Sequence, residues 1–184
     1  MRIIAGKFKG RHLKAVSGSS TRPTGDKIKE AVFHRIGPFF EGGSCLDLFA
    51  GSGSLGMEAI SRGMDKAIFV DHTNSAIRTI HKNIQLLQIE QQCEVYRNDA
   101  LRAIQLMGKR NIGFDLILLD PPYDKMNYGK LLNELEKQHL ANDNCMIYLE
   151  HRPEEEIPFN NNYFKMVTEK KYSTTTCITI LQAI

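Results

Sequence analysis

A tetrapeptide, Asp120-Pro121-Pro122-Tyr123, follows directly after the apolar run Phe114–Leu119. Open α/β sheets bind ligands at the carboxyl ends of their strands, and the tetrapeptide stands at such an end. Its two prolines fix the backbone and remove two N–H donors, which leaves carbonyl groups free to accept from a ligand. Asp120 adds an acceptor, and Tyr123 adds a flat ring on which a base can stack. The four residues predict a site for a planar amine; an ordinary rigid turn is the alternative.

A glycine-rich turn lies upstream, in the spacing Gly51-x-Gly53-x-x-Gly56 between a strand-like run and a helical one. Glycines there permit a tight turn and a close approach of a ligand to the backbone. Asp71 ends the next predicted strand, where a carboxylate can bind two ribose hydroxyls. The pattern predicts a nucleoside cofactor, but it does not choose between NAD and S-adenosylmethionine.

Asp47 helps to choose, because it stands inside an apolar strand, where an unpaired carboxylate is costly. It can pair with the cationic amino group of a methionine moiety, whereas NAD offers no cation at that place. The alternative is that Asp47 ties down the glycine turn through hydrogen bonds to its backbone. Asp99, at the end of the third strand, can accept from an adenine amino group, and it can also cap the helix that follows.

These motifs need a scaffold of strands that alternate with helices, and the hydrophobic pattern predicts one. The expected strands cover residues 45–49, 67–70, 93–97, 114–119 and 145–149, and the expected helices cover 55–62, 75–88, 100–107 and 128–139. A further helix follows Thr24, its expected cap. The alternation predicts an open parallel sheet with helices on both faces. Two β-rich runs, 163–171 and 174–181, predict a closing antiparallel hairpin.

The basic residues are concentrated at the N-terminus. Residues 1–35 hold nine basic and two acidic side chains, a net charge of +7, whereas the remainder carries −4. The stretch 1–16 alternates short apolar runs with glycines and predicts a β-hairpin or extended arm. We therefore divide the chain into a basic extension, 1–20, and a main domain, 21–184. Such an arm suits a polyanion, because phosphate neutralisation releases counterions; a merely soluble surface is the alternative.

Composition excludes several other classes of protein. The 184 residues are 42% hydrophobic and 24% charged, which is ordinary for a soluble globular chain. No apolar run reaches the roughly 20 residues of a membrane span, and none has the form of a signal peptide. The four cysteines are expected to be reduced core thiols, and the histidines lack metal-ligand spacing. We expect a cytoplasmic protein without a membrane or a metal.

Taken together, the motifs resemble those of the RsmD-type 16S ribosomal RNA guanine-N2 methyltransferases, a class I S-adenosylmethionine-dependent family. The resembling residues span most of the chain: Arg2-Ile3-Ile4-Ala5-Gly6, Gly10-Arg11, Leu13, Arg22-Pro23-Thr24, Phe33, Leu46–Gly53 and Asp120–Tyr123. The resemblance implies a seven-stranded α/β class I fold, S-adenosyl-L-methionine as cofactor, and ribosomal RNA, within a small-subunit particle, as partner. Asp71 stands where the family is expected to have Glu, so its ribose contact is expected to run through water.

Three sets of site residues follow from the motifs and the resemblance. The expected catalytic residues are Asp120, Pro121, Pro122 and Tyr123. The expected cofactor-binding residues are Asp47, Phe49, Ala50, Gly51, Ser52, Gly53, Asp71, Asn98, Asp99 and Asp120. The expected RNA-binding residues are Arg2, Lys7, Lys9, Arg11, Arg22 and Thr24.

Three other functions are consistent with parts of the sequence. A DNA adenine or cytosine amino-methyltransferase shares the chemistry, but such enzymes usually carry an added recognition domain for which this chain has no room. An NAD-dependent oxidoreductase shares the glycine turn and leaves the tetrapeptide unexplained. A non-enzymatic RNA-binding assembly factor has no need of the intact acidic residues. The oligomeric state, monomer or weak dimer, stays open.

Overall fold

One sheet of seven strands forms the centre of the protein. The structure is a computed structural model, and it describes residues 1–17, 23–122 and 127–184. The strands are β1 (Ser44–Asp47), β2 (Lys66–Asp71), β3 (Cys93–Arg97), β4 (Phe114–Leu119), β5 (Ala141–His151), β6 (Phe164–Lys171) and β7 (Cys177–Ala183). Their order is β3-β2-β1-β4-β5-β7-β6. The first five are parallel, and β7 pairs antiparallel with both β5 and β6. The predicted α/β class with a closing antiparallel hairpin is confirmed.

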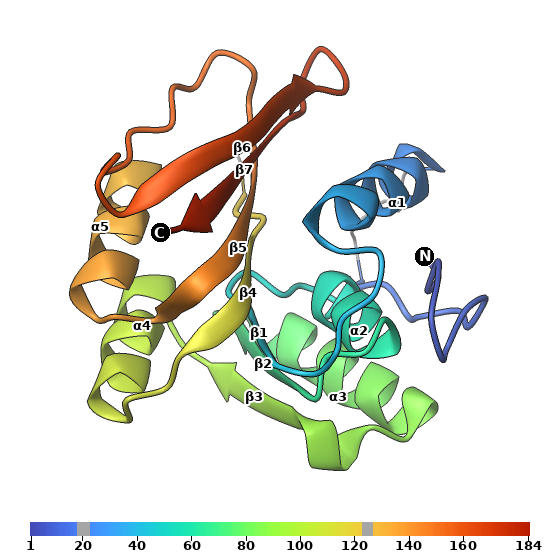
Figure 1. Cartoon of the computed structure of the whole chain (residues 1–184). Helices are drawn as coiled ribbons and strands as arrows, with labels where there is room; N and C mark the ends of the chain where they lie inside the picture. The colour runs from blue at the N-terminus through green and yellow to red at the C-terminus, as the bar shows by residue number, and fades with distance from the viewer. Residues whose placement is uncertain (18–22, 123–126) are drawn as a thin grey trace.

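Helices cover both faces of the sheet (Figure 1). They are α1 (Pro23–Ile36), α2 (Ser54–Ser61), α3 (Asn74–Leu87), α4 (Ala100–Lys109) and α5 (Tyr128–Lys137), with a 3₁₀ turn, η1, at Glu90–Gln92. The helices α4 and α5 pack on one face, and α1, α2 and α3 pack on the other, so the core has two layers. Among the helices of the described residues, none combines the length and the apolar character that a membrane crossing needs.

Among the boundaries that differ from the expected ones, two next to the predicted site have clear physical reasons. The helix α1 begins at Pro23, so Thr24 lies inside its first turn and the predicted cap at that position is wrong; proline suits the first helical position because its fixed φ is already helical. The strand β1 ends at Asp47 rather than at residue 49. The backbone beyond it still pairs, since the Leu48 N–H donates to the Leu118 carbonyl and the Ala50 N–H to the Val70 carbonyl, before the chain turns away.

The parallel strands bring the predicted site residues to one edge of the sheet. The glycine turn follows β1, Asp71 ends β2, Asn98 and Asp99 follow β3, and Asp120 follows β4. Because these four strands are parallel neighbours, their carboxyl ends meet at the same edge.

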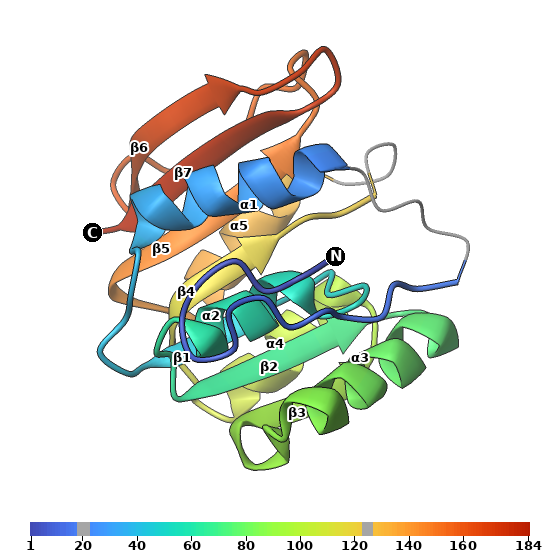
Figure 2. The same cartoon turned by 90° about the vertical axis from the view of Figure 1, so that its right-hand side faces the viewer.

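The N-terminal arm, residues 1–14, folds back on itself. Arg2 and His12 form a single antiparallel bridge, the Ile3 N–H donates to the Arg11 carbonyl, and the Gly10 N–H donates to the Ile3 carbonyl. The arm lies along α2 (Figure 2), where the Lys7 N–H donates to the Ser61 carbonyl at 2.7 Å. The expected hairpin is therefore present as one bridge and a turn rather than as two full strands.

Candidate active site

The glycine turn leaves an open place at its first glycine and packs tightly at its last. Gly51 has a φ of 54°, and a Cβ built on it would meet no heavy atom within 4 Å. A Cβ on Gly56 would instead lie 2.5 Å from the ring of Phe69. The turn thus offers bare backbone to a ligand at Gly51, while Gly56 allows α2 to approach β2 closely.

Asp47 lies beneath the turn and is only 1% exposed. Its Oδ2 accepts a hydrogen bond from the Gly56 N–H at 3.0 Å. Gly53, the N-cap of α2, has no side chain with which to cap, so the strand carboxylate satisfies one of the free N–H groups of the helix. The expected alternative role, tying down the backbone of the turn, is therefore present in the structure.

Burial nevertheless destabilises the ionised form of the Asp47 carboxyl. Burial raises the pKa of its carboxyl to about 7, the Gly56 hydrogen bond opposes the shift, and the charge of Asp71 adds to it. Among the described residues, no Lys, Arg or His forms an ion pair with Asp47. A cationic ligand at the turn would offset this desolvation, since a nearby positive charge favours the carboxylate.

Asp71 joins the glycine turn to the start of α3. Its Oδ2 accepts from the Gly51 N–H at 3.0 Å, and its Oδ1 accepts from the N–H and the hydroxyl of Thr73 at 2.9 and 3.0 Å. Thr73 is in turn the N-cap of α3. Three of the carboxylate's roughly four lone-pair sites are thus occupied, and the side chain is 12% exposed, so one ribose hydroxyl can still donate to Oδ2.

Asn98 and Asp99 directly follow β3 and lie at the same edge of the sheet. The Asn98 N–H donates to the Asp71 carbonyl at 3.0 Å, which fixes the end of β3 beside the end of β2. Asp99 is the N-cap of α4 and accepts from the Arg102 N–H at 3.2 Å. The capping role of Asp99 is thus observed, and its contact with an adenine amino group stays a prediction.

Asp120 is an exposed residue at the end of β4, while Pro121 is buried and Pro122 exposed. Many protein atoms nevertheless surround the carboxyl, and this desolvation raises the pKa of Asp120 well above its usual value. The negative charges of Glu150 and Asp47 raise the pKa further. Tyr123, the fourth predicted catalytic residue, lies outside the described residues.

Three carboxyl groups share one face of the sheet edge. In the β1–β4 register Asp47 pairs with Leu118, and Asp120 follows two positions later, so both side chains project from the same face. Leu119 pairs with Leu149 between β4 and β5, which sets Glu150 beside Asp120. Sequence reasoning missed Glu150 because it ended the fifth strand at Leu149; the rule that located Asp120 applies equally to this neighbouring strand end.

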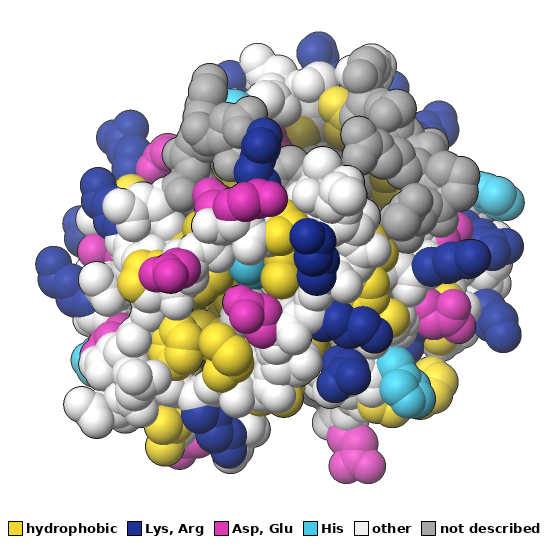
Figure 3. All heavy atoms as spheres, turned by 90° about the horizontal axis from the view of Figure 1, so that it is seen from above, with side chains coloured by type: hydrophobic (Ala, Val, Ile, Leu, Met, Phe, Trp, Pro, Cys, Tyr) yellow, Lys and Arg dark blue, Asp and Glu magenta, His cyan; other side chains and the backbone are white. Residues whose placement is uncertain are grey.

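The predicted RNA-binding residues that are described lie on the exposed side of the arm. Lys7, Lys9 and Arg11 are exposed, and Arg2, whose side chain is 57% exposed, forms an ion pair with Asp26 at 3.2 Å. Arg22 and the Thr24 side chain lie outside the described residues. Figure 3 shows Lys and Arg side chains spread over the upper face, both at its rim and near its middle, rather than gathered in one patch.

Buried polar side chains that were not predicted from the sequence anchor the arm. Glu58, fully buried on α2, accepts from the N–H groups of Ile4 and Ala5 at 2.8 and 3.0 Å, and it pairs with Lys29 and Arg62. A carboxylate in the middle of the otherwise apolar helix Ser54–Ser61 was the available signal. An anion in such a helix requires buried partners.

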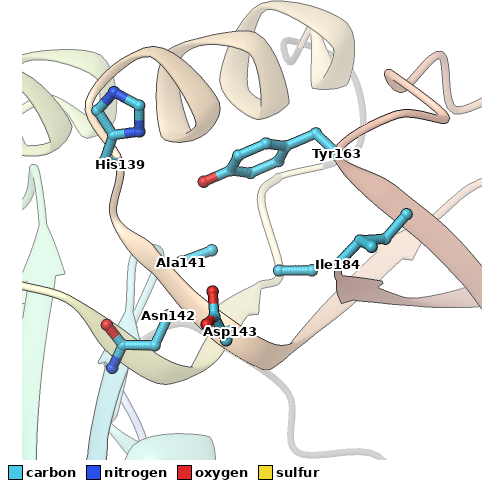
Figure 4. A pocket seen from close by; sticks show the side chains of 7 residues that line it. His139, Ala141, Asn142, Asp143, Tyr163 and Ile184 are labelled. Carbon is cyan, nitrogen blue, oxygen red and sulfur yellow. The ribbon is translucent and has the colours of Figure 1, made fainter.

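The described part of the chain holds two other groups of polar side chains. One is a hollow at the opposite edge, where β5 begins, and none of the predicted site residues belongs to it (Figure 4). Its lining residues are His139, Ala141, Asn142, Asp143, Tyr163, Ala183 and Ile184. The other joins His151, Glu169 and Cys177 across β5, β7 and β6. There the Thr179 hydroxyl already lies 2.8 Å from His151 Nε2, in the place that a metal on that nitrogen would need.

Comparison with known proteins matches the whole length of the fold. Residues 1–181 match the family described as conserved hypothetical protein 95. YlbH of Bacillus subtilis, provisionally named an rRNA methyltransferase, is 46% identical over 175 residues, which cover 95% of each chain. The ribosomal RNA small subunit methyltransferase D of Haemophilus influenzae is 35% identical over 151 residues, which cover 82% of this chain and 78% of that one.

A solved structure is similar over the same span. The Escherichia coli protein yhhF, provisionally named a methyltransferase, superposes with a TM-score of 0.85 at 27% identity. The superposition covers 100% of this chain and 97% of that one. The arm and the sheet edge described above are therefore parts of an architecture shared with these relatives.

Proposed function

Because this chain belongs to the family described as conserved hypothetical protein 95, the RsmD family, we propose that it transfers a methyl group from S-adenosylmethionine to N2 of a guanine in small-subunit ribosomal RNA. The observation that carries the proposal is the position of Asp120. Its carboxyl stands beside Asp47 and Glu150, on the face of the sheet edge from which the glycine turn opens.

The residues at the turn fit the cofactor. Gly51 offers the bare backbone that an adenosyl group can approach, and Asp71 offers a carboxylate oxygen for its ribose. Asp47 offers a desolvated carboxylate without a cationic partner among the described residues, which suits an amino acid ammonium group. Asp99 keeps one carboxyl oxygen for an adenine amino group while the other caps α4. When bound, the cofactor supplies an electrophilic methyl group.

Asp120 and Pro121 orient the amine. The exocyclic amine of guanine is a weak nucleophile because its lone pair is delocalised into the ring, so orientation matters more than prior deprotonation. The Asp120 carboxyl and the Pro121 carbonyl accept its two N–H bonds and aim the lone pair at the methyl group. With the cofactor bound, the N–C bond would form as the S–C bond to the methyl group breaks, S-adenosylhomocysteine would leave, and Asp120 would offset the positive charge that develops on nitrogen. The raised pKa of Asp120 also suits a group that takes up the proton which the methylated amine then loses.

The arm supplies the contacts to the RNA backbone. The exposed cations Lys7, Lys9 and Arg11 lie on a segment packed against α2, the helix that opens from the glycine turn. Phosphate contacts of this kind fix the register of a nucleic acid without reading its sequence. The target guanine must be unpaired or turned out of its stack to reach the sheet edge.

The decisive experiment is transfer of labelled methyl from S-adenosylmethionine to small ribosomal subunits, naked ribosomal RNA and DNA, followed by mass identification of the modified nucleoside. N2-methylguanosine from the RNA samples is the expected result. Label found only in DNA would assign the chain to the DNA amino-methyltransferases instead.

A variant separates the chemistry from cofactor binding. Asp120→Ala is expected to abolish transfer while binding of S-adenosylhomocysteine, measured by calorimetry, persists. Full activity in that variant would remove Asp120 from the mechanism. Asp143→Ala, at the opposite edge of the sheet, is the matched control and should transfer normally.

A further inference from the structure

A buried amide binds the arm to the glycine turn itself. Asn83, on α3, is fully buried. Its Oδ1 accepts from the Lys14 N–H at 2.8 Å, and its Nδ2 donates to the Lys14 carbonyl at 3.0 Å. The same Nδ2 donates to the carbonyl of Ser52, inside the turn, at 2.9 Å. Asn83 therefore holds the end of the arm and the turn together.

The start of the arm meets the same residue of the turn. The Ser52 hydroxyl lies 3.1 Å from Met1 Sδ, and the Leu13 N–H donates to the Met1 carbonyl at 3.0 Å. Both ends of the folded arm thus converge on Ser52. A displacement of Ser52 cannot leave the arm unchanged, because hydrogen bonds lost in a buried place are costly.

A second set of buried contacts joins the arm to the helix after the turn. Lys29 Nζ, 5% exposed, donates to the Arg2 carbonyl at 2.6 Å and to the Ser54 hydroxyl at 2.9 Å, and Ser54 is the first residue of α2. Glu58 binds the arm backbone from the same helix. Turn, helix and arm are therefore one hydrogen-bonded unit.

The exposed side of that unit is basic. Lys7, Lys9, Arg11 and Lys14 are exposed, while the arm backbone beneath them is hydrogen-bonded to Asn83, Glu58 and Ser61. A ligand that fixes the glycine turn therefore also fixes the arm backbone that carries these cations. By linkage, if the ligand at the turn raises the affinity of the arm for a polyanion, the polyanion raises the affinity of the turn for its ligand by the same factor.

We propose that Asn83 is a positioning residue that couples the cofactor turn to the RNA-binding arm, so that cofactor and RNA each raise the affinity for the other. The RNA half of this inference rests on the proposed function. The contact between Asn83 and the turn does not, and it can be tested without RNA and without catalysis.

The test without RNA is hydrogen exchange of the arm amides. The Ile4, Ala5 and Lys14 N–H groups are bonded to Glu58 and Asn83, so their exchange reports the docking of the arm. Saturating S-adenosylhomocysteine is expected to slow their exchange in the wild type. In Asn83→Ser, where the bridge from Ser52 to Lys14 is lost, the ligand should protect the turn but no longer the arm. Equal protection of the arm in both proteins would overturn the proposal.

The test with RNA is the affinity for S-adenosylhomocysteine with and without saturating small ribosomal subunits isolated from cells that lack this protein. A rise of about fivefold or more is expected in the wild type, and a ratio near one in Asn83→Ser. Asn83→Asp, which keeps the volume and the acceptor but loses both donated bonds, replaces the serine variant if that protein does not fold. An undiminished ratio in the variant rejects Asn83 as the coupling residue.

The matched control is Asn142→Ser. Its amide donates to Asp115 at 2.9 Å near the opposite edge of the sheet, so this variant should couple like the wild type. Loss of coupling in the control as well would show a general effect of amide removal and would also reject the proposal. Failure of the proposed function has a different signature: no methyl transfer to RNA, with the hydrogen-exchange response intact.

Discussion

The carboxylate of Asp47 accepts a hydrogen bond from the Gly56 N–H at 3.0 Å and so joins the end of β1 to the first turn of α2. A strand residue thereby caps a helix whose own N-cap is a glycine. The arrangement stabilises the turn, but it also holds an acidic group where burial raises its pKa to about 7. Retention of an acid at such a place is understandable if a cation binds there.

Asp47→Asn is expected to be more stable than the wild type at neutral pH. The native carboxyl binds its proton up to about pH 7, whereas in the unfolded chain it ionises near pH 4, so wild-type stability falls as pH rises between these values. The fall amounts to ~4 kcal/mol. Asn keeps the acceptor for Gly56 and does not ionise. Thermal melts from pH 4 to pH 8 should show the two proteins diverging as pH rises; parallel curves would contradict the raised pKa. The same variant should bind S-adenosylhomocysteine more weakly.

Substitution of the two outer glycines of the turn should have different effects, chiefly on ligand affinity at Gly51 and chiefly on stability at Gly56. Gly51→Ala adds a methyl group to open space at a positive φ, which costs about 1–2 kcal/mol of stability. The variant should also weaken S-adenosylhomocysteine binding at least tenfold, because the methyl group occupies the ligand's place. Gly56→Ala pushes a methyl group against Phe69 and should chiefly lower the thermal midpoint. Calorimetric titration and melting of both variants test the contrast, and equal losses of affinity would refute it.

The elements that carry the site were largely predictable, because their signals are local. The run Phe114–Leu119 forms β4 with the expected bounds, since five of its six residues are apolar, which suits a strand covered on both faces. The strand β5 runs further than expected at both ends, from Ala141 to His151, because its polar first residues do not read as a strand. The roles of Glu58 and Asn83 in holding the arm escaped notice because their partners in the arm lie more than 50 residues away, and no local period reports such contacts.

Glu58→Gln should destabilise the protein strongly. The carboxylate is fully buried between Lys29 and Arg62, and its loss leaves two buried cations without their counter-charge, at a cost of about 3–5 kcal/mol. Burial already lowers the pKa of Lys29, and the attraction of Glu58 opposes that shift. Denaturant unfolding measures the effect. Glu94→Gln, which breaks the exposed pair with Arg110, is the control and should change the midpoint far less.

Neutralising the arm should weaken RNA binding and leave cofactor binding unchanged in the absence of RNA. In Lys9→Gln/Arg11→Gln two exposed cations are lost, so the slope of log affinity against log salt should become shallower by roughly 1.4–1.8. Filter binding of small-subunit RNA at several salt concentrations measures that slope. Lys165→Gln/Lys170→Gln removes two exposed cations from β6 and serves as the control. An equal change of slope in both double variants would show that the arm has no special part in binding.

The docking of the arm also sets an order of events during synthesis. Lys14 is bonded to Asn83, 69 residues further along the chain, so the arm cannot dock until a segment made much later has left the ribosome. At 5–20 residues per second that interval is roughly 3–14 seconds. During it the arm lacks the partner that holds its end, and it becomes part of the folded protein only when α3 has emerged.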